Sequence, residues 1–217
     1  ELLKIKRNSM LTYSLACLTG AAVFSTLVLG TPPVNPAQAF LQLTIFLLVI
    51  FSSLPPLFLQ RKGYGELIES FLFFILVPAA AVMVNLGELP PLLELLTVPI
   101  FFVYLAGKLV FSLRTYLADK TGGYPNLLNR LDWEKAMRLH NTLIIATYFL
   151  IGIFSFVGLP WGFTWPMLIT LPIAVFEVLL IIGITRGGKP NWTLLEWTSG
   201  MLTGSMVYLV LLTLWLH

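Results

Sequence analysis

The run LIESFLFFILVPAAAVMVNL occupies residues 67–86 and decides the class of fold. Its length matches the roughly 20 residues that an α-helix needs to cross the hydrocarbon core of a membrane. The whole chain shares this character: 58% of its 217 residues are hydrophobic and 11% are charged, against roughly 25% charged residues in a soluble domain. With a mean hydropathy of +0.89, the chain is predicted to be an integral membrane protein.

Six further apolar runs of similar length accompany this one. They are Met10–Leu29, Ala37–Leu59, Leu92–Leu113, Leu143–Leu159, Trp165–Thr185 and Leu195–Trp215. Turn and loop residues separate the runs, and seven spans with short loops use nearly the whole chain. We therefore expect an all-α fold, a polytopic transmembrane helix bundle of about seven spans that forms a single domain over residues 1–217. Prolines inside the runs predict kinks or helix breaks at Pro55, Pro78, Pro99 and Pro172.

Basic residues mark one side of the expected bundle. With the N-terminus inside, the loops on that side hold twelve of the 13 Lys and Arg residues, and the loops on the other side hold none. This positive-inside pattern predicts a cytoplasmic N-terminus, a cytoplasmic loop over residues 114–141 and a C-terminus on the opposite side. Because the basic residues are spread over separate short loops rather than one patch, membrane lipid is the expected partner and nucleic acid is not.

The run 92–113 leads into the longest loop through a row of polar residues. Lys108, Ser112, Thr115 and Asp119 follow each other at spacings of four, three and four, which places them on one face of a helix. A polar face inside a span is costly unless it lines a cavity or pairs with another helix. Both alternatives remain open from the sequence.

Lys108 is the one basic residue away from a loop, and Glu177 is its expected structural counterpart. The two residues should lie at comparable depths below the same membrane face. One hypothesis is therefore a buried Lys108–Glu177 pair, and the other is an anionic head group facing Lys108. Residues 131–139 have the pattern of an amphipathic interfacial helix, and we interpret His140 as an interfacial residue rather than a base.

Several motifs resemble the UbiA superfamily of intramembrane prenyltransferases, whose members join a polyprenyl diphosphate to an aromatic or other acceptor. GYGEL at 63–67 is similar to the family's G-x-G-E-L, and RTYLADK at 114–120 to its second aspartate motif, R-D-x-x-x-D-K. RLD at 130–132 resembles the R-L-G that follows. The resemblance covers roughly residues 10–217 and implies a UbiA-like bundle without the family's first two spans.

The resemblance also implies roles for individual residues. Asp119 would be a ligand of Mg²⁺, the expected cofactor of a catalytic member, which neutralises charge on the diphosphate leaving group. Substrate-binding residues would be Lys108, Ser112, Arg114, Lys120 and Arg130. The chain departs from the family at Thr115, where an aspartate is usual, and in having no first aspartate motif: Asp119 and Asp132 are its only aspartates.

Two functions from different classes follow. The first is prenyl transfer from a polyprenyl diphosphate to an aromatic or quinone-precursor acceptor, by an N-terminally incomplete chain. The second is a non-catalytic relative that binds lipid, quinone or pigment, or has a structural role, within a larger membrane protein complex.

Overall fold

The computed structural model describes residues 7–29, 35–54 and 57–216, and in this part of the chain it contains helices and no strand. The elements are α1 (Arg7–Leu29), α2 (Pro36–Ser53), α3 (Gly65–Phe71), the π-helical turn η1 (Leu72–Leu76), α4 (Val77–Leu86), α5 (Pro91–Gly122), α6 (Leu127–Leu131), α7 (Trp133–Val157), α8 (Trp161–Ile169), α9 (Leu171–Thr185) and α10 (Trp192–Leu216). The expectation of an all-α fold is confirmed.

Five helical segments in the described residues are long and apolar enough to cross a membrane. They are α2, the continuous segment from α3 to α4, α5, α7 and α10. The pair α8 and α9, bent by 41° at its break, makes a sixth if it crosses as one span. In α1 the apolar stretch Ala16–Leu27 is shorter than these segments. Five to six helices can therefore span a membrane.

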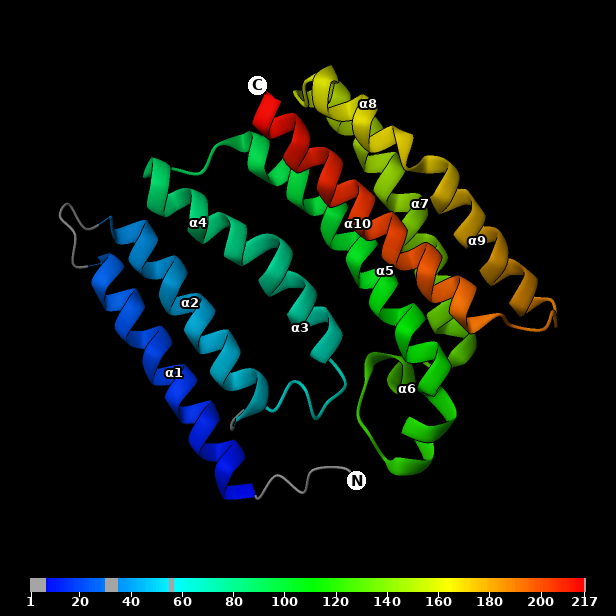
Figure 1. Cartoon of the computed structure of the whole chain (residues 1–217), viewed down its shortest axis with the longest axis horizontal. Coiled ribbons are helices and arrows are strands. Elements are labelled where there is room, and N and C mark those ends of the chain that lie inside the picture. The colour runs from blue at the N-terminus through cyan, green and yellow to red at the C-terminus, as the bar shows by residue number, and fades with distance from the viewer. Residues whose placement is uncertain (1–6, 30–34, 55–56, 217) are drawn as a thin grey trace.

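The basic loops lie at one end of the helices. Figure 1 shows the start of α1, the α2–α3 connection, the α5–α7 connection and the α9–α10 connection toward the lower and right side of the view. The α4–α5 and α7–α8 connections and the end of α10 lie along the opposite edge. The charge asymmetry of the sequence is therefore an asymmetry between the two ends of the fold.

The centre of the fold is α5, which contacts α3, α6, α7 and α10. Its residues Ala106, Leu109 and Val110 are fully buried, because α7 and α10 pack on this side of the helix. On the other side α3 packs on α5, α2 packs on α4, and α1 packs on α2. Figure 1 shows α1, α2 and the α3–α4 segment side by side in one row beside α5.

The prolines act in different ways. Pro78 follows the π-helical turn η1 and stands in the first turn of α4, and Pro172 stands in the first turn of α9 just after the bend from α8. These two positions confirm the expected irregularities, since proline cannot donate the backbone hydrogen bond of a helix interior. Pro99 lies inside α5 without ending it, and Pro55 falls outside the described residues.

Candidate functional site

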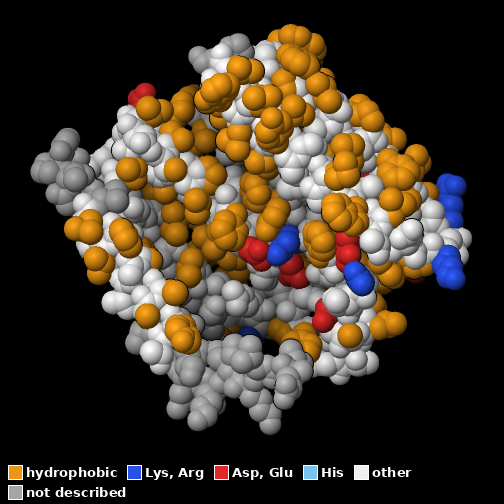
Figure 2. All heavy atoms as spheres, viewed as in Figure 1, with side chains coloured by type: hydrophobic (Ala, Val, Ile, Leu, Met, Phe, Trp, Pro, Cys, Tyr) orange, Lys and Arg blue, Asp and Glu red, His pale blue; other side chains and the backbone are white. Residues whose placement is uncertain are grey.

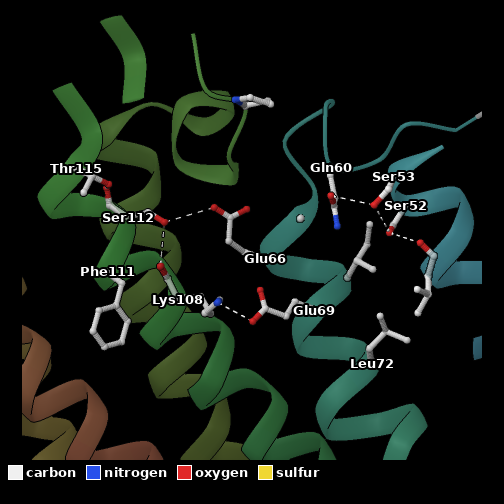
Figure 3. A pocket seen from close by; sticks show the side chains of 14 residues that line it. Ser52, Ser53, Gln60, Glu66, Glu69, Leu72, Lys108, Phe111, Ser112 and Thr115 are labelled. Carbon is white, nitrogen blue, oxygen red and sulfur yellow. Dashed lines mark hydrogen bonds and ion pairs between the residues drawn. The ribbon is translucent and has the colours of Figure 1, made fainter. Parts of the chain in front are cut away.

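A polar cavity of about 700 Å³ opens between α2, α3 and α5. Its walls combine hydroxyl, amide and charged side chains with apolar ones, from residues Val49, Ser52, Ser53, Gln60, Gly65, Glu66, Ile68, Glu69, Leu72, Lys108, Phe111, Ser112, Thr115 and Pro125. Figure 3 shows the side chains of α5 facing those of α3 and α2 across this space. In Figure 2 acidic and basic side chains gather in the middle of a face that is otherwise largely apolar.

An ion pair joins the two main walls of the cavity. Lys108 Nζ on α5 donates to Glu69 Oε1 on α3 at 2.7 Å, and the side chains are 28% and 39% exposed. Tyr104 OH also donates to Glu69 Oε1, at 3.1 Å. A partly exposed ion pair within two apolar helices is costly against acyl chains. The pair therefore requires a polar environment in the cavity.

A second carboxylate, Glu66, lies one helical turn from Glu69 on the same face of α3. Glu66 Oε2 accepts from the backbone N–H of Leu127 at 3.0 Å, and Ser112 Oγ donates to Glu66 Oε1 at 3.4 Å. Ser112 also lies within reach of the Lys108 carbonyl oxygen, at 3.1 Å. Glu66 thus connects the start of α3 to α5 and to the start of α6, at the wall of the cavity.

The predicted polar face of α5 does line one cavity. Lys108, Ser112 and Thr115 all contribute to its wall. Asp119 stands one turn further along: Thr115 Oγ1 donates to Asp119 Oδ2 at 2.6 Å, and Asn126 Nδ2 donates to the same oxygen at 3.1 Å. Asp119 is therefore one hydrogen bond away from the cavity.

Asp119 makes hydrogen bonds at the position where the resemblance implies a Mg²⁺ ligand. Magnesium requires near-octahedral oxygen ligation, usually with one or two carboxylates, and Asp119 Oδ2 is already shared by two donors. Among the residues that the structure describes, no group of three or more His, Cys, Asp or Glu side chains could hold a metal ion. The role of Asp119 as a metal ligand stays a prediction from the resemblance.

Three of the predicted substrate-binding residues, Arg114, Lys120 and Arg130, make hydrogen bonds to groups that do not line the cavity. Arg114 Nη1 donates to Glu196 Oε2 on α10 at 2.8 Å. Lys120 Nζ donates to Tyr116 OH at 3.0 Å, on the same helix. Arg130 Nη1 donates to the Lys62 carbonyl at 3.2 Å, and its guanidinium lies 4.4 Å from the centre of the Tyr64 ring. Of the five, only Lys108 and Ser112 line the cavity.

The expected Lys108–Glu177 pair is wrong. Lys108 pairs with Glu69, whereas Glu177 is fully buried on α9 and contacts His140 on α7, with 3.1 Å between Glu177 Oε1 and His140 Nε2. His140, which the sequence suggested to be an interfacial residue, is fully buried inside the protein. The amphipathic pattern of 131–139 is confirmed, as Ala136 and Met137 are buried in the first turns of α7, which continues directly into a span.

The sequence reasoning missed Glu66 and Glu69 as site residues. Both are in or next to the apolar run 67–86, three residues apart, and this spacing places two carboxylates on one helical face. A charged residue inside an apolar run is by itself a signal for a functional position. That signal could have identified Glu69 as a candidate site residue.

Comparisons of the chain with protein-family models, with curated proteins and with solved structures found no match. The resemblance to the UbiA superfamily therefore stays an expectation from the motifs of the sequence.

Proposed function

We propose that this chain is a multi-pass membrane protein that binds an amphipathic, quinone-like ligand in the cavity between α2, α3 and α5, as a non-catalytic relative of UbiA-type prenyltransferases. In this proposal α1 adds a seventh crossing, and the α5–α7 connection faces the cytoplasm. The C-terminus lies on the opposite side.

One observation carries the proposal. The Lys108–Glu69 ion pair lies at the wall of a cavity of about 700 Å³. The hydroxyl-bearing residues Ser112 and Thr115 line the same cavity. Intramembrane charges normally face a bundle interior or a polar cavity, and they mark binding sites or ion pathways more often than packing. A ligand with a polar head group supplies the environment that this pair needs.

The charges of the cavity favour a neutral head group. Its lining holds two carboxylates, Glu66 and Glu69, against one ammonium group, Lys108, so a diphosphate would meet net negative charge without a metal ion. A quinone or phenol ring instead accepts or donates single hydrogen bonds and stacks on apolar side chains. Ser112 and Lys108 can donate to a carbonyl oxygen, while Ile68, Leu72 and Phe111 supply apolar wall.

The test measures equilibrium binding of a radiolabelled, fully ring-substituted quinone to the purified chain in mild detergent. We expect Ser112→Ala and Lys108→Met each to weaken binding by about tenfold, the loss of one hydrogen bond in a poorly solvated site. Lys135→Met, an exposed position on α7, is the matched control and should bind like the wild type. Binding unchanged in both cavity variants, or no saturable binding by the wild type, would contradict the proposal.

Prenyl transfer is the second candidate function, favoured by the position of Asp119 one hydrogen bond from the cavity-lining Thr115. Its test is incubation with radiolabelled polyprenyl diphosphate, Mg²⁺ and aromatic acceptors, comparing wild type with Asp119→Ala. Transfer that disappears in the variant would replace the binding proposal by the enzyme. Equal background levels in both would leave binding as the function.

A further inference from the structure

A separate hollow, of about 560 Å³, lies between α7 and α9 at the end of the fold where the basic loops lie. Glu134, Arg138 and Asn141 of α7 line it, together with Ile182 and Thr185 of α9. It shares no lining residue with the polar cavity between α2, α3 and α5. An occupant of this hollow is therefore independent of the proposed quinone site.

The hollow contains one charged side chain of each sign. Glu134 and Arg138 are four residues apart on α7, which places them on one helical face with about 6 Å of rise between them. Both are exposed, and among the residues that the structure describes neither forms an ion pair. A carboxylate and a guanidinium thus line the hollow, and their charges sum to zero.

Neutral polar groups complete the lining. His140 Nδ1 lies 3.1 Å from Asn141 Oδ1, which leaves the amide nitrogen of Asn141 as a donor. Thr185 Oγ1 donates to the Ile182 carbonyl at 2.7 Å, so this hydroxyl can accept a further hydrogen bond. The hollow can therefore bind an anionic group and a cationic group at the same time.

Exposed apolar side chains continue from the hollow along both helices. They are Ile145, Phe149 and Phe156 on α7, and Leu179 and Val175 on α9. On α7 they follow Asn141 at spacings of four, four and seven, and on α9 they precede Ile182 at spacings of three and four. Each row thus shares a helical face with a residue that lines the hollow. A polar site of both charges above an apolar surface matches the boundary between lipid head groups and acyl chains.

We propose that this hollow binds a phosphatidylethanolamine molecule. Arg138 and Asn141 donate to its phosphate, Glu134 accepts from its ammonium group, and the acyl chains lie on the two apolar rows. The ammonium of this lipid is two carbon atoms from a phosphate oxygen, so one head group can bridge residues about one helical turn apart.

The carboxylate selects among head groups. A primary ammonium donates a charge-assisted hydrogen bond to Glu134, whereas the trimethylammonium of phosphatidylcholine has no N–H to donate. The head group of phosphatidylglycerol is an anion without a cationic partner for Glu134, and it meets a hollow with no net positive charge. The order of affinity should therefore place phosphatidylethanolamine first.

The experiment titrates the purified whole chain in mild detergent with each of these three lipids, with identical acyl chains, and measures bound lipid by native mass spectrometry. We expect phosphatidylethanolamine to bind at least about fivefold more tightly than phosphatidylcholine. Glu134→Gln should abolish this preference. Arg138→Gln should weaken both lipids by about fivefold, because both carry the phosphate.

Two exposed positions outside the hollow give matched controls. Lys135→Gln removes a positive charge from the same turn of α7, and Glu88→Gln removes a negative charge in the α4–α5 connection. Both variants should bind the three lipids like the wild type. Quinone binding by Arg138→Gln should also be unchanged, and a loss there would contradict the independence of the two sites.

The remaining outcomes decide against the proposal. Equal binding of the three lipids by the wild type would make the hollow part of the ordinary lipid-covered surface. Tightest binding of phosphatidylglycerol, strengthened by Glu134→Gln, would show a site for anionic lipid in which the carboxylate only repels. A preference for phosphatidylethanolamine that survives Glu134→Gln would place the ammonium group elsewhere.

Discussion

The fold contains two ionisable side chains that are fully buried against each other, His140 on α7 and Glu177 on α9. His140 Nδ1 lies 3.1 Å from Asn141 Oδ1, whereas Glu177 Oε2 has no hydrogen-bond partner in the described structure. A buried charged pair gains little over apolar packing, but removing one partner leaves the other unpaired in a medium that cannot solvate it. The pair is therefore a strong constraint on how α7 and α9 pack.

Substituting one member of this pair should destabilise the fold more than substituting both. We expect Glu177→Leu and His140→Leu each to lower the free energy of unfolding by about 3 kcal/mol, and the double variant to lower it by less than either single variant. The measurement is unfolding in mixed detergent micelles followed by tryptophan fluorescence. Additive losses in the double variant would mean that the two side chains do not stabilise each other.

The residues of the site could be predicted only in part from the sequence. That Lys108 and Ser112 share one face of α5 could be predicted, because helical spacing alone decides which residues share a face. Whether that face lines a cavity or pairs with another helix stayed open, and Lys108 does both. The partner of Lys108 was predicted wrongly, because spacing along one helix does not determine which neighbouring helix packs on it. Glu177 and Glu69 were both intramembrane carboxylates, and only the packing of α3 on α5 distinguishes them.

At the scale of elements, the end of the α2–α3 connection packs closely against the start of α6. Gly63 is buried there with a φ of 78°, in the left-handed region that favours glycine. A Cβ at this position would lie 2.7 Å from the carbonyl oxygen of Asn126. The close approach brings Glu66 within reach of the Leu127 N–H, so the geometry of the cavity depends on this contact.

Gly63→Ala should therefore loosen the polar cavity. We expect a loss of about 1–3 kcal/mol in the free energy of unfolding, from the unfavourable φ and the clash with backbone. Gly65→Ala is the matched control. Gly65 is the first residue of α3, and a Cβ at this position would meet only the Gln60 side chain, at 3.8 Å. Thermal unfolding in detergent checks both, and equal midpoints for the two variants would contradict the role given to Gly63.

A second close approach joins α5 to α10. A Cβ on Gly107 would lie 2.9 Å from Ser199 Oγ, whereas one on Gly204, on α10, would meet nothing within 4 Å. Gly107→Leu should force the two helices apart and cost about 1–3 kcal/mol of stability. Gly204→Leu, with the same change in helix propensity, should stay close to the wild type in the same unfolding assay. A Gly107→Leu variant as stable as Gly204→Leu would show that the two helices do not need their close packing.

At the scale of the whole molecule, hydropathy predicted the helices well, since about 20 apolar residues satisfy their backbone only as a helix in lipid. The lateral order of the helices could not be predicted. In Figure 1 α1, α2 and the α3–α4 segment form a row on one side of α5, while α7 and α10 pack on the other. The cavity lies between this row and α5, so it depends on an arrangement that periodicity does not encode.

The orientation of the molecule is tested by cysteine labelling in a Cys17→Ser background. Thr121→Cys, near the end of α5, should react with a membrane-impermeant maleimide in inside-out vesicles only, because the positive-inside pattern predicts that the basic loops face the cytoplasm. Glu88→Cys, in the α4–α5 connection, should react only in right-side-out vesicles; both positions are exposed. The reverse labelling pattern would contradict the predicted topology.

The central claim is that the space between α2, α3 and α5 is a ligand site, and photoaffinity labelling tests it most directly. A quinone with a photoreactive group on its head is cross-linked to the whole chain in mild detergent, and the labelled peptides are mapped by mass spectrometry. We predict saturable labelling of residues 65–71 of α3 and 104–115 of α5, displaced by excess unlabelled quinone. Labelling confined to the α7 and α9 peptides, or labelling that excess ligand does not displace, would contradict the account.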